Sequence, residues 1–214
     1  MEQLSRKEFE IEQRRFFIIN QAETLFAERG YEGTTMAEIA NASELALATV
    51  YHCFPSKEDI FLTLVEKKNE EFLAFIQEDV NLGNDASEKI SRIINAQLEY
   101  FERNKKFFKI LIFMNQFKIF SWINEQGAKG RIERRFMDYL TFLANIISDG
   151  KKEGIFGDFD PMDMSFSLFG MLHFLIYRWI FEGETRPISV VAKSAITFFL
   201  SGLQRPIKKE SLNK

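Results

Sequence analysis

Apolar residues recur every three to four positions along almost the whole chain, and no alternation typical of strands persists. Start and stop signals divide this pattern into helices. Gly30 ends the first, and Thr35 with Glu38 three positions later is typical of a capping box. Asp160 before a proline marks another start. The predicted helices cover 7–29, 35–43, 46–53, 56–80, 86–104, 105–120, 128–151, 161–182 and 188–204. The predicted fold class is therefore all-α.

The segment 34–54 is the most informative part of the pattern. A capped helix, a tight turn and a second short helix are typical of the helix-turn-helix, whose second helix lies in the major groove of DNA. The same geometry also occurs as plain structural packing. Side chains that offer hydrogen bonds to phosphates or base edges are Thr49, Tyr51, His52 and, at the start of the next helix, Lys57.

An ordered set of short motifs in this region resembles the TetR family of bacterial transcriptional regulators. The resemblance covers about residues 14–61, and its motifs are Leu25–Tyr31, Thr34–Met36, Ile39–Ala40, Thr49–His52 and Phe54–Glu58. It implies a homodimer with a three-helix DNA-binding head and a six-helix C-terminal body that binds a small effector and releases DNA. The implied domains are a head over 1–55, a body for effector binding and dimerisation over 56–205, and a tail over 206–214.

The resemblance also implies roles for single residues. Thr34 and Thr35 would hold phosphate at the start of the second helix, Lys57 would contact phosphate, and Phe54 would be a buried hinge. From the residues themselves, Leu47 offers a contact to a thymine methyl, and Ala48 lets the backbone approach the groove. The predicted DNA-binding residues are Thr34, Thr35, Leu47, Ala48, Thr49, Tyr51, His52 and Lys57.

The predicted head departs from the usual pattern of the family at its DNA-reading surface. Glu44 stands where glycine is frequent in the turn, Ala46 where serine caps the recognition helix, and Leu47 where a polar residue is usual. Residues 1–60 hold 6 Lys or Arg and 11 Asp or Glu, which gives a net charge of 6 − 11 = −5. Because phosphate attraction is the main source of DNA affinity, we expect weak binding unless Arg6, Lys7, Arg14 and Arg15 cluster.

Composition narrows the class of protein. The chain of 214 residues carries a net charge of −3, and its single cysteine, Cys53, excludes an internal disulfide and favours a reducing compartment. The charged start lacks the apolar core of a signal peptide, and no apolar run reaches the length of a membrane span. With two histidines and one cysteine, no metal or cofactor site is predicted. We expect a cytoplasmic protein that does not associate with a membrane.

The chain has 24 phenylalanines, most of them after residue 60. This composition predicts either a strongly hydrophobic, fully packed core or a core with an apolar pocket. A pocket would take a hydrophobic effector such as a fatty acyl chain, a bile-like or aromatic compound, or a lipophilic drug. His173 is interpreted as a core histidine, with a polar group facing the ligand as the alternative. The candidate effector residues are Phe101, Phe108, Phe113, Phe117, Trp122, Phe136, Tyr139 and His173.

The last two predicted helices combine large apolar residues with small ones that permit close helix approach. In the family that the chain resembles, such a pair forms a four-helix bundle with its twofold mate. Palindromic DNA half-sites independently call for two heads at a fixed spacing. The candidate dimer interface is Phe166, Phe169, Val191, Ala195, Phe198 and Gly202.

These observations favour a ligand-responsive transcriptional regulator, interpreted as a repressor that a small hydrophobic effector releases from its operator. The acidic head and Leu47 motivate an alternative, a lipophile- or partner-binding protein whose head no longer reads DNA. An enzyme is poorly supported, because the sequence has no nucleophile elbow, phosphate loop or metal-ligand set.

Overall fold

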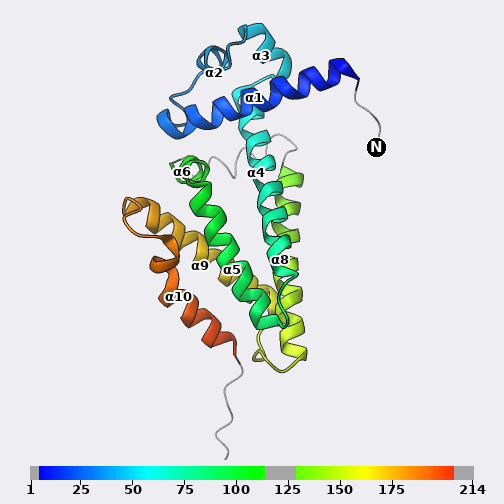
Figure 1. The fold of residues 1–214 in the computed structure, drawn as a ribbon, viewed down its shortest axis with the longest axis vertical. Coiled ribbons are helices and arrows are strands. Elements are labelled where there is room, and N and C mark those ends of the chain that lie inside the picture. The colour runs from blue at the N-terminus through cyan, green and yellow to red at the C-terminus, as the bar shows by residue number, and fades with distance from the viewer. Residues whose placement is uncertain (1–4, 114–128, 205–214) are drawn as a thin grey trace, which may run out of the picture. The chain divides into compact units, whose positions relative to one another are not determined.

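The computed structural model describes residues 5–113 and 129–204, apart from the side chains of 112–113 and 129–133. Within these ranges the chain is helical, and its elements follow one another as Figure 1 shows. The helices are α1 (Arg6–Arg29), α2 (Met36–Ala42), α3 (Leu47–Cys53), α4 (Lys57–Val80), α5 (Ala86–Arg103), α6 (Lys105–Phe113), α8 (Lys129–Lys152), α9 (Pro161–Phe181) and α10 (Ile188–Leu203). The all-α prediction is confirmed, and the predicted part of 105–120 beyond 113 lies outside the described residues.

Short polar motifs fix where the helices begin. At α2 the Glu38 N–H donates to Thr35 Oγ1 at 3.2 Å, while the Thr35 N–H donates to Glu38 Oε2 at 2.8 Å, so the predicted capping box is present. Ser56 caps α4 by accepting from the Asp59 N–H at 3.1 Å. Asp160 accepts from the first two free N–H groups of α9. These caps satisfy donors that would otherwise lack partners at the helix ends.

The chain divides into two compact units, and the first consists of residues 1–71 and 104–132. In its described part α1 packs against α2, α3 and α6, and α2 packs against α3. The rings of Phe26, Tyr31 and Phe61 meet at centroid distances between 5.3 and 6.2 Å in its core. The first half of α4 is therefore built into the same core as the helix-turn-helix.

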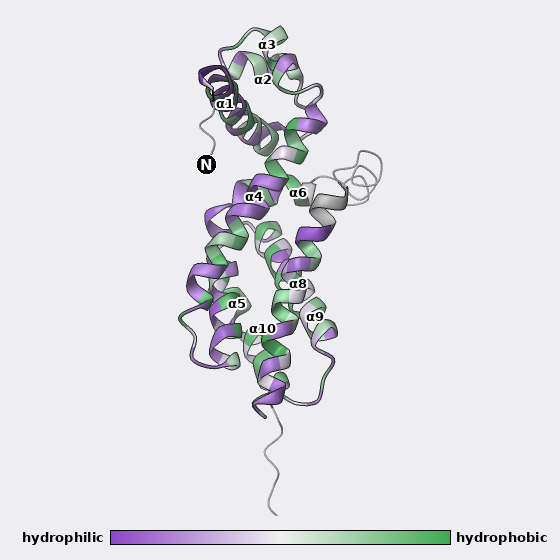
Figure 2. Ribbon diagram, turned by 90° about the vertical axis from the view of Figure 1, so that its right-hand side faces the viewer, coloured by the Kyte–Doolittle hydropathy of each residue, from purple (hydrophilic) through white to green (hydrophobic). Residues whose placement is uncertain are grey.

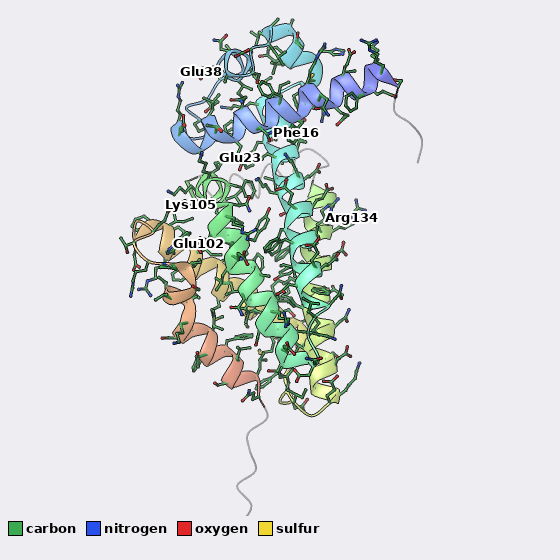
Figure 3. The ribbon with its side chains drawn as sticks, viewed as in Figure 1. Phe16, Glu23, Glu38, Glu102, Lys105 and Arg134 are labelled. Carbon is green, nitrogen blue, oxygen red and sulfur yellow. The ribbon has the colours of Figure 1, made fainter. Side chains whose placement is uncertain are left out.

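Two lysines on the first half of α4 strengthen its attachment to α1. Lys67 Nζ lies 4.2 Å from the centroid of the Phe16 ring, and Lys68 Nζ lies 3.3 Å from Glu23 Oε1. Phe16 and Glu23 both project from α1 (Figure 3). The two contacts hold α4 against α1 beyond its buried apolar face.

The second unit consists of residues 72–103 and 133–214. In its described part α5 packs against α9 and α10, and α9 packs against α10. Buried leucines and isoleucines at helical spacing fill its core, for example Ile90, Ile93 and Ile94 on α5. Gly150 is required by close packing, because a Cβ there would lie 2.3 Å from the ring of Phe156.

By length and composition alone, α9 could cross a membrane. Its buried residues nevertheless recur at three- and four-residue spacing, at Ser165, Leu168, Leu172, Ile176 and Trp179. One face of α9 therefore packs inside the second unit, and a core helix passes the same test of length and composition. Figure 2 shows that α10, which packs beside it, is also largely hydrophobic, whereas α1 is mostly hydrophilic.

Candidate DNA-binding surface and effector site

The helix α3 turns one face into the core and one face outward. Val50 and Cys53 are buried, whereas Leu47 and Tyr51 are 41% and 50% exposed. Ala48 and His52 are exposed beside them, and Thr49 is half-buried. The outward face of α3 therefore has an apolar first turn and hydrogen-bonding groups only in its second half, in the order that the sequence predicts.

The start of α3 is weakly supported. Ala46 occupies the cap position and offers no side-chain acceptor, so only its carbonyl receives hydrogen bonds, from the N–H groups of Thr49 and Val50. Glu44, in the turn before it, has φ = 55°. This left-handed conformation costs a non-glycine residue free energy, which explains why glycine is frequent at this position in the family that the chain resembles.

The end of α3 is strongly supported by Arg15 of α1. The Arg15 guanidinium donates to the carbonyl of Cys53, in the last turn of α3, and lies 4.1 Å from the centroid of the Phe54 ring. Phe54 is buried, as the sequence predicts. Arg15 thus holds the recognition helix in place from α1, a role that the sequence did not reveal.

Two of the predicted phosphate contacts are bonded inside the protein. Thr34 is buried, and its hydroxyl donates to the carbonyl of Gly30 at 2.9 Å. Lys57 Nζ donates to the carbonyls of Tyr31 and Thr34, both at 2.7 Å, and lies 4.2 Å from the centroid of the Tyr31 ring. Both side chains thus bond within the protein, Thr34 buried and Lys57 half-buried, and their contacts with phosphate stay predictions. Thr35 is exposed and caps α2.

Ion pairs neutralise further cations of the head. Arg6 Nε lies 3.1 Å from Glu10 Oε1, and Arg29 Nη1 lies 2.9 Å from Glu38 Oε1; Glu38 projects from α2 (Figure 3). Hydrogen bonds from Thr35 hold the pKa of Glu38 below its ordinary value. Among the four basic residues near the start of the chain, Lys7 and Arg14 are exposed and lie outside these pairs.

In the second unit, five aromatic side chains form a closed ring of contacts. Phe72 stacks on Phe101 at 5.9 Å between centroids, and Phe101 meets His173 at 5.4 Å. His173 meets Phe169 at 3.7 Å, Phe169 meets Tyr139 at 6.4 Å, and Tyr139 returns to Phe72 at 5.3 Å. We call these five residues the aromatic ring cluster. It joins α4, α5, α8 and α9.

A polar pair lies on the aromatic ring cluster. The Tyr139 hydroxyl donates to Gln97 Oε1 at 2.6 Å, and both side chains are buried. Gln97 precedes Phe101 by one turn of α5. Its amide nitrogen, Nε2, has no hydrogen-bond partner within residues 5–113 and 129–204. The cluster therefore combines packed aromatic side chains with a buried donor that the described residues leave unpaired.

His173 is the second polar member of this region. Its Nδ1 lies 3.0 Å from the carbonyl of Phe169, so this nitrogen carries the proton and Nε2 is left as an acceptor. Burial lowers the pKa of His173 to about 4, and the ring is neutral near pH 7. His173 thus packs among the rings of the cluster, and the alternative interpretation, a polar group facing the ligand, stays a prediction.

The structure brings together four of the eight predicted effector residues. Phe101, Tyr139 and His173 belong to the aromatic ring cluster, and Phe136 contacts Phe169 at 4.8 Å. Phe108 lies on α6, in the first unit, and its ring meets that of Phe107. The side chain of Phe113, together with Phe117 and Trp122, lies outside the described residues.

The sequence did not predict Phe72, Phe169 and Gln97 as residues of the effector site, although Phe169 was predicted at the dimer interface. A signal for Gln97 was present. It falls on the apolar stripe of α5 that Ile90, Ile93, Ile94 and Phe101 define, where a polar residue needs an explanation. Phe72 had no such signal, because it precedes Phe101 by 29 positions and only the fold brings the two rings together.

Most of the predicted dimer interface lies at the surface of the chain. Phe198 is 81% exposed, and Phe166 and Gly202 are exposed, whereas Val191 and Ala195 are half-buried. Phe169 instead faces the aromatic ring cluster.

Three further aromatic residues of α9, outside the list of predicted interface residues, are exposed. Phe174 stacks on Tyr177, and Tyr177 stacks on Phe181, at 6.1 and 5.9 Å between centroids. A row of exposed stacked rings is unusual for a monomer and is typical of an interaction surface.

Comparison with family models matches nearly the whole chain. Residues 18–64 match the model described as bacterial regulatory proteins, tetR family. Residues 65–202 match the model described as YsiA-like protein, C-terminal region. The first match contains the helix-turn-helix, and the second contains the aromatic ring cluster.

Curated and solved relatives share the fold at low identity. The fatty acid metabolism regulator protein of Bacillus subtilis is 23% identical over 191 residues, which cover 87% of this chain and 93% of the relative. The crystal structure of FadR from Bacillus subtilis in complex with stearoyl-CoA has a TM-score of 0.74 at 21% identity, covering 88% of this chain and 99% of the other. The structure of AibR in complex with isovaleryl coenzyme A and operator DNA has a TM-score of 0.71 at 23% identity, covering 86% and 97%.

Proposed function

We propose, from the premise that the chain belongs to the TetR family of bacterial regulatory proteins, that it represses transcription until a long-chain acyl thioester binds its body. The chain is a ligand-responsive, DNA-binding transcriptional regulator. The observation that carries the choice of effector is the aromatic ring cluster, whose apolar walls suit an acyl chain. Relatives of the same fold bind stearoyl-CoA and isovaleryl coenzyme A, which supports a thioester.

The helix α4 provides the mechanical link in this proposal. Its first half is fixed to the helix-turn-helix core through Lys57, Lys67 and Lys68. Its second half carries Phe72, a member of the aromatic ring cluster. An effector that displaces Phe72 therefore acts on the same helix that follows the recognition helix. Release of DNA requires that the effector bind the form with wrongly spaced heads more tightly than the DNA-bound form.

The protein acts as a homodimer in this proposal, because a palindromic operator needs two heads. The exposed rings of Phe174, Phe181 and Phe198 supply an apolar surface for the partner copy. We expect Phe174→Asp combined with Phe198→Asp to yield a monomer in solution, measured by light scattering at micromolar concentration. A wild-type protein that is monomeric under the same conditions would contradict the homodimer.

The proposal places the protein in the cytoplasm, where its DNA is, and assigns it no catalytic activity. The test is selection of bound sequences from random DNA, repeated with and without stearoyl-CoA. We expect a palindromic motif that is lost in the presence of the thioester. Tyr51→Ala should weaken binding of the selected duplex, whereas the exposed Gln77→Ala on α4 should not. Binding without sequence preference at low salt would favour the alternative, a lipophile-binding module whose head no longer reads DNA.

A further inference from the structure

The amide nitrogen of Gln97 is one of two buried side-chain polar atoms without a hydrogen-bond partner in the described part of the chain; the other is the hydroxyl oxygen of Ser43. An unpaired buried donor costs free energy, because it loses its hydrogen bonds to water and gains none in return. The Ser43 hydroxyl is small and lies at the end of α2. The Gln97 amide has two donor hydrogens and lies against the aromatic ring cluster.

The Tyr139 hydroxyl pairs with the oxygen of the Gln97 amide. It donates to Oε1 at 2.6 Å, and the hydrogens of Nε2 are left without a partner among the described residues. The aromatic rings that contact Tyr139 are Phe72 and Phe169, neither of which offers a strong acceptor. In the described part of the chain the Gln97 donor therefore lies beside aromatic rings and has no acceptor within hydrogen-bonding distance.

We propose that the Gln97 amide is a specificity-determining contact that binds a hydrogen-bond-accepting oxygen on the lipophilic effector. This inference rests on the proposed function, because it assigns a ligand contact within the same effector site. The oxygen is uncharged, since the described residues that form the cluster include no cation to balance an anion. Two sources share this chemistry, the carbonyl of the thioester itself and a hydroxyl or keto group along the acyl chain.

The Gln97 amide also determines which lipophilic ligands the site rejects. An acyl chain that has no oxygen next to Gln97 excludes water from the amide and leaves it unpaired. An acyl chain with an oxygen at that position accepts its hydrogen bond. A site built in this way discriminates against the analogue that lacks the polar atom more strongly than an apolar pocket discriminates between chain lengths. The effector is therefore selected by the position of an oxygen as well as by its apolar volume.

Three probes of equal chain length separate the two sources. Stearoyl-CoA has the thioester carbonyl, S-octadecyl-CoA is the thioether that lacks it, and a mid-chain hydroxystearoyl-CoA has both the carbonyl and a second oxygen. Their affinities for the full-length protein are measured by calorimetry, on wild type and on Gln97→Met, which keeps the side-chain volume and removes the amide. Gln77→Met makes the same change at an exposed position of α4 and is the matched control.

A second variant guards against misfolding of Gln97→Met, which leaves the Tyr139 hydroxyl without its acceptor. Gln97→Met combined with Tyr139→Phe removes both polar groups of the pair, so neither is left buried without a hydrogen-bond partner. Thermal melting checks that each variant is folded before binding is measured. Both variants should show the same loss of preference among the probes.

We expect wild type and Gln77→Met to prefer one oxygen-bearing probe over its matched analogue by about tenfold or more, and Gln97→Met to bind the pair equally. Preference for stearoyl-CoA over the thioether identifies the carbonyl, and preference for the hydroxystearoyl probe over stearoyl-CoA identifies a chain oxygen. Equal binding of all three probes to wild type, or a preference that survives in Gln97→Met, would overturn the inference and leave the proposed function standing. Absence of binding by all three contradicts the proposed function itself.

Discussion

The head and the aromatic ring cluster treat their polar groups differently. In the head, Thr34, Lys57 and Arg15 each bond to backbone carbonyls of neighbouring elements. In the cluster, the Gln97 amide is held by one partner and leaves its donors unused. The difference shows that these three side chains of the helix-turn-helix region already use their polar groups within the fold, where they maintain the shape of α3. The cluster is complete only with a further molecule.

The largest expected effect comes from breaking the cluster. Phe101 is 2% exposed and contacts both Phe72 and His173. Phe101→Ala should lower the free energy of unfolding by about 3–5 kcal/mol, because it removes a buried ring and leaves a cavity. Denaturant unfolding measures this. Phe9→Ala, at a 54% exposed ring on α1, is the control and should change stability by less than about 0.5 kcal/mol.

The next effect concerns acid sensitivity of the cluster. The pKa of His173 is about 4 in the folded protein and about 6.5 when unfolded, so the unfolded chain binds a proton first as the pH falls. The neutral His173 ring contributes about 3 kcal/mol to the free energy of unfolding above pH 6.5. This contribution is lost as the pH falls from about 6.5 to 4. Melting curves across this range should show that loss in wild type.

The His173→Asn variant supplies the control for the acid effect. Its amide can still donate to the Phe169 carbonyl but does not titrate, so the part of the stability loss due to His173 disappears. If the two proteins lose the same amount of stability between pH 6.5 and 4, the pKa of His173 is not lowered in the folded protein.

A smaller effect should come from the support of the recognition helix. Arg15→Ala removes a charged hydrogen bond to Cys53 and a contact with the Phe54 ring, which together contribute about 2 kcal/mol. Unfolding experiments measure the loss. The neighbouring Arg14→Ala separates the two kinds of arginine, because Arg14 is exposed. It should keep the stability and reduce the salt dependence of DNA binding. Equal stability losses in the two variants would refute the distinction.

The smallest expected effect is a gain. Glu44 has φ = 55°, a conformation that costs a non-glycine residue about 1 kcal/mol. Glu44→Gly should therefore raise the free energy of unfolding by up to about 1 kcal/mol and also remove a negative charge near the recognition helix. Glu44→Ala removes the charge but keeps the strain, so it should strengthen DNA binding without the gain in stability. A gain of the same size in both variants would show that charge, not backbone conformation, decides.

The helix boundaries of the fold were predictable from the sequence because their signals are local. The capping box of Thr35 and Glu38 and the Asp160-Pro161 pair lie within four residues of the helix starts that they fix. The outward face of α3 was predictable for the same reason.

The candidate sites were predictable only in part, because their contacts join distant positions. Arg15 acts on Cys53 from 38 positions away, and Tyr139 acts on Gln97 from 42 positions away. No periodicity in the sequence encodes such pairs. The same holds for Lys57, whose carbonyl partners, Tyr31 and Thr34, lie 26 and 23 positions away.

The central claim is that an acyl thioester and the operator compete through one conformational equilibrium. Fluorescence anisotropy of the selected duplex, titrated with protein at increasing stearoyl-CoA, tests it most directly. We predict that saturating thioester weakens DNA binding at least about fivefold, and that DNA weakens thioester binding by the same factor, as linkage requires. Operator affinity that stays constant while stearoyl-CoA demonstrably occupies the protein would contradict the account.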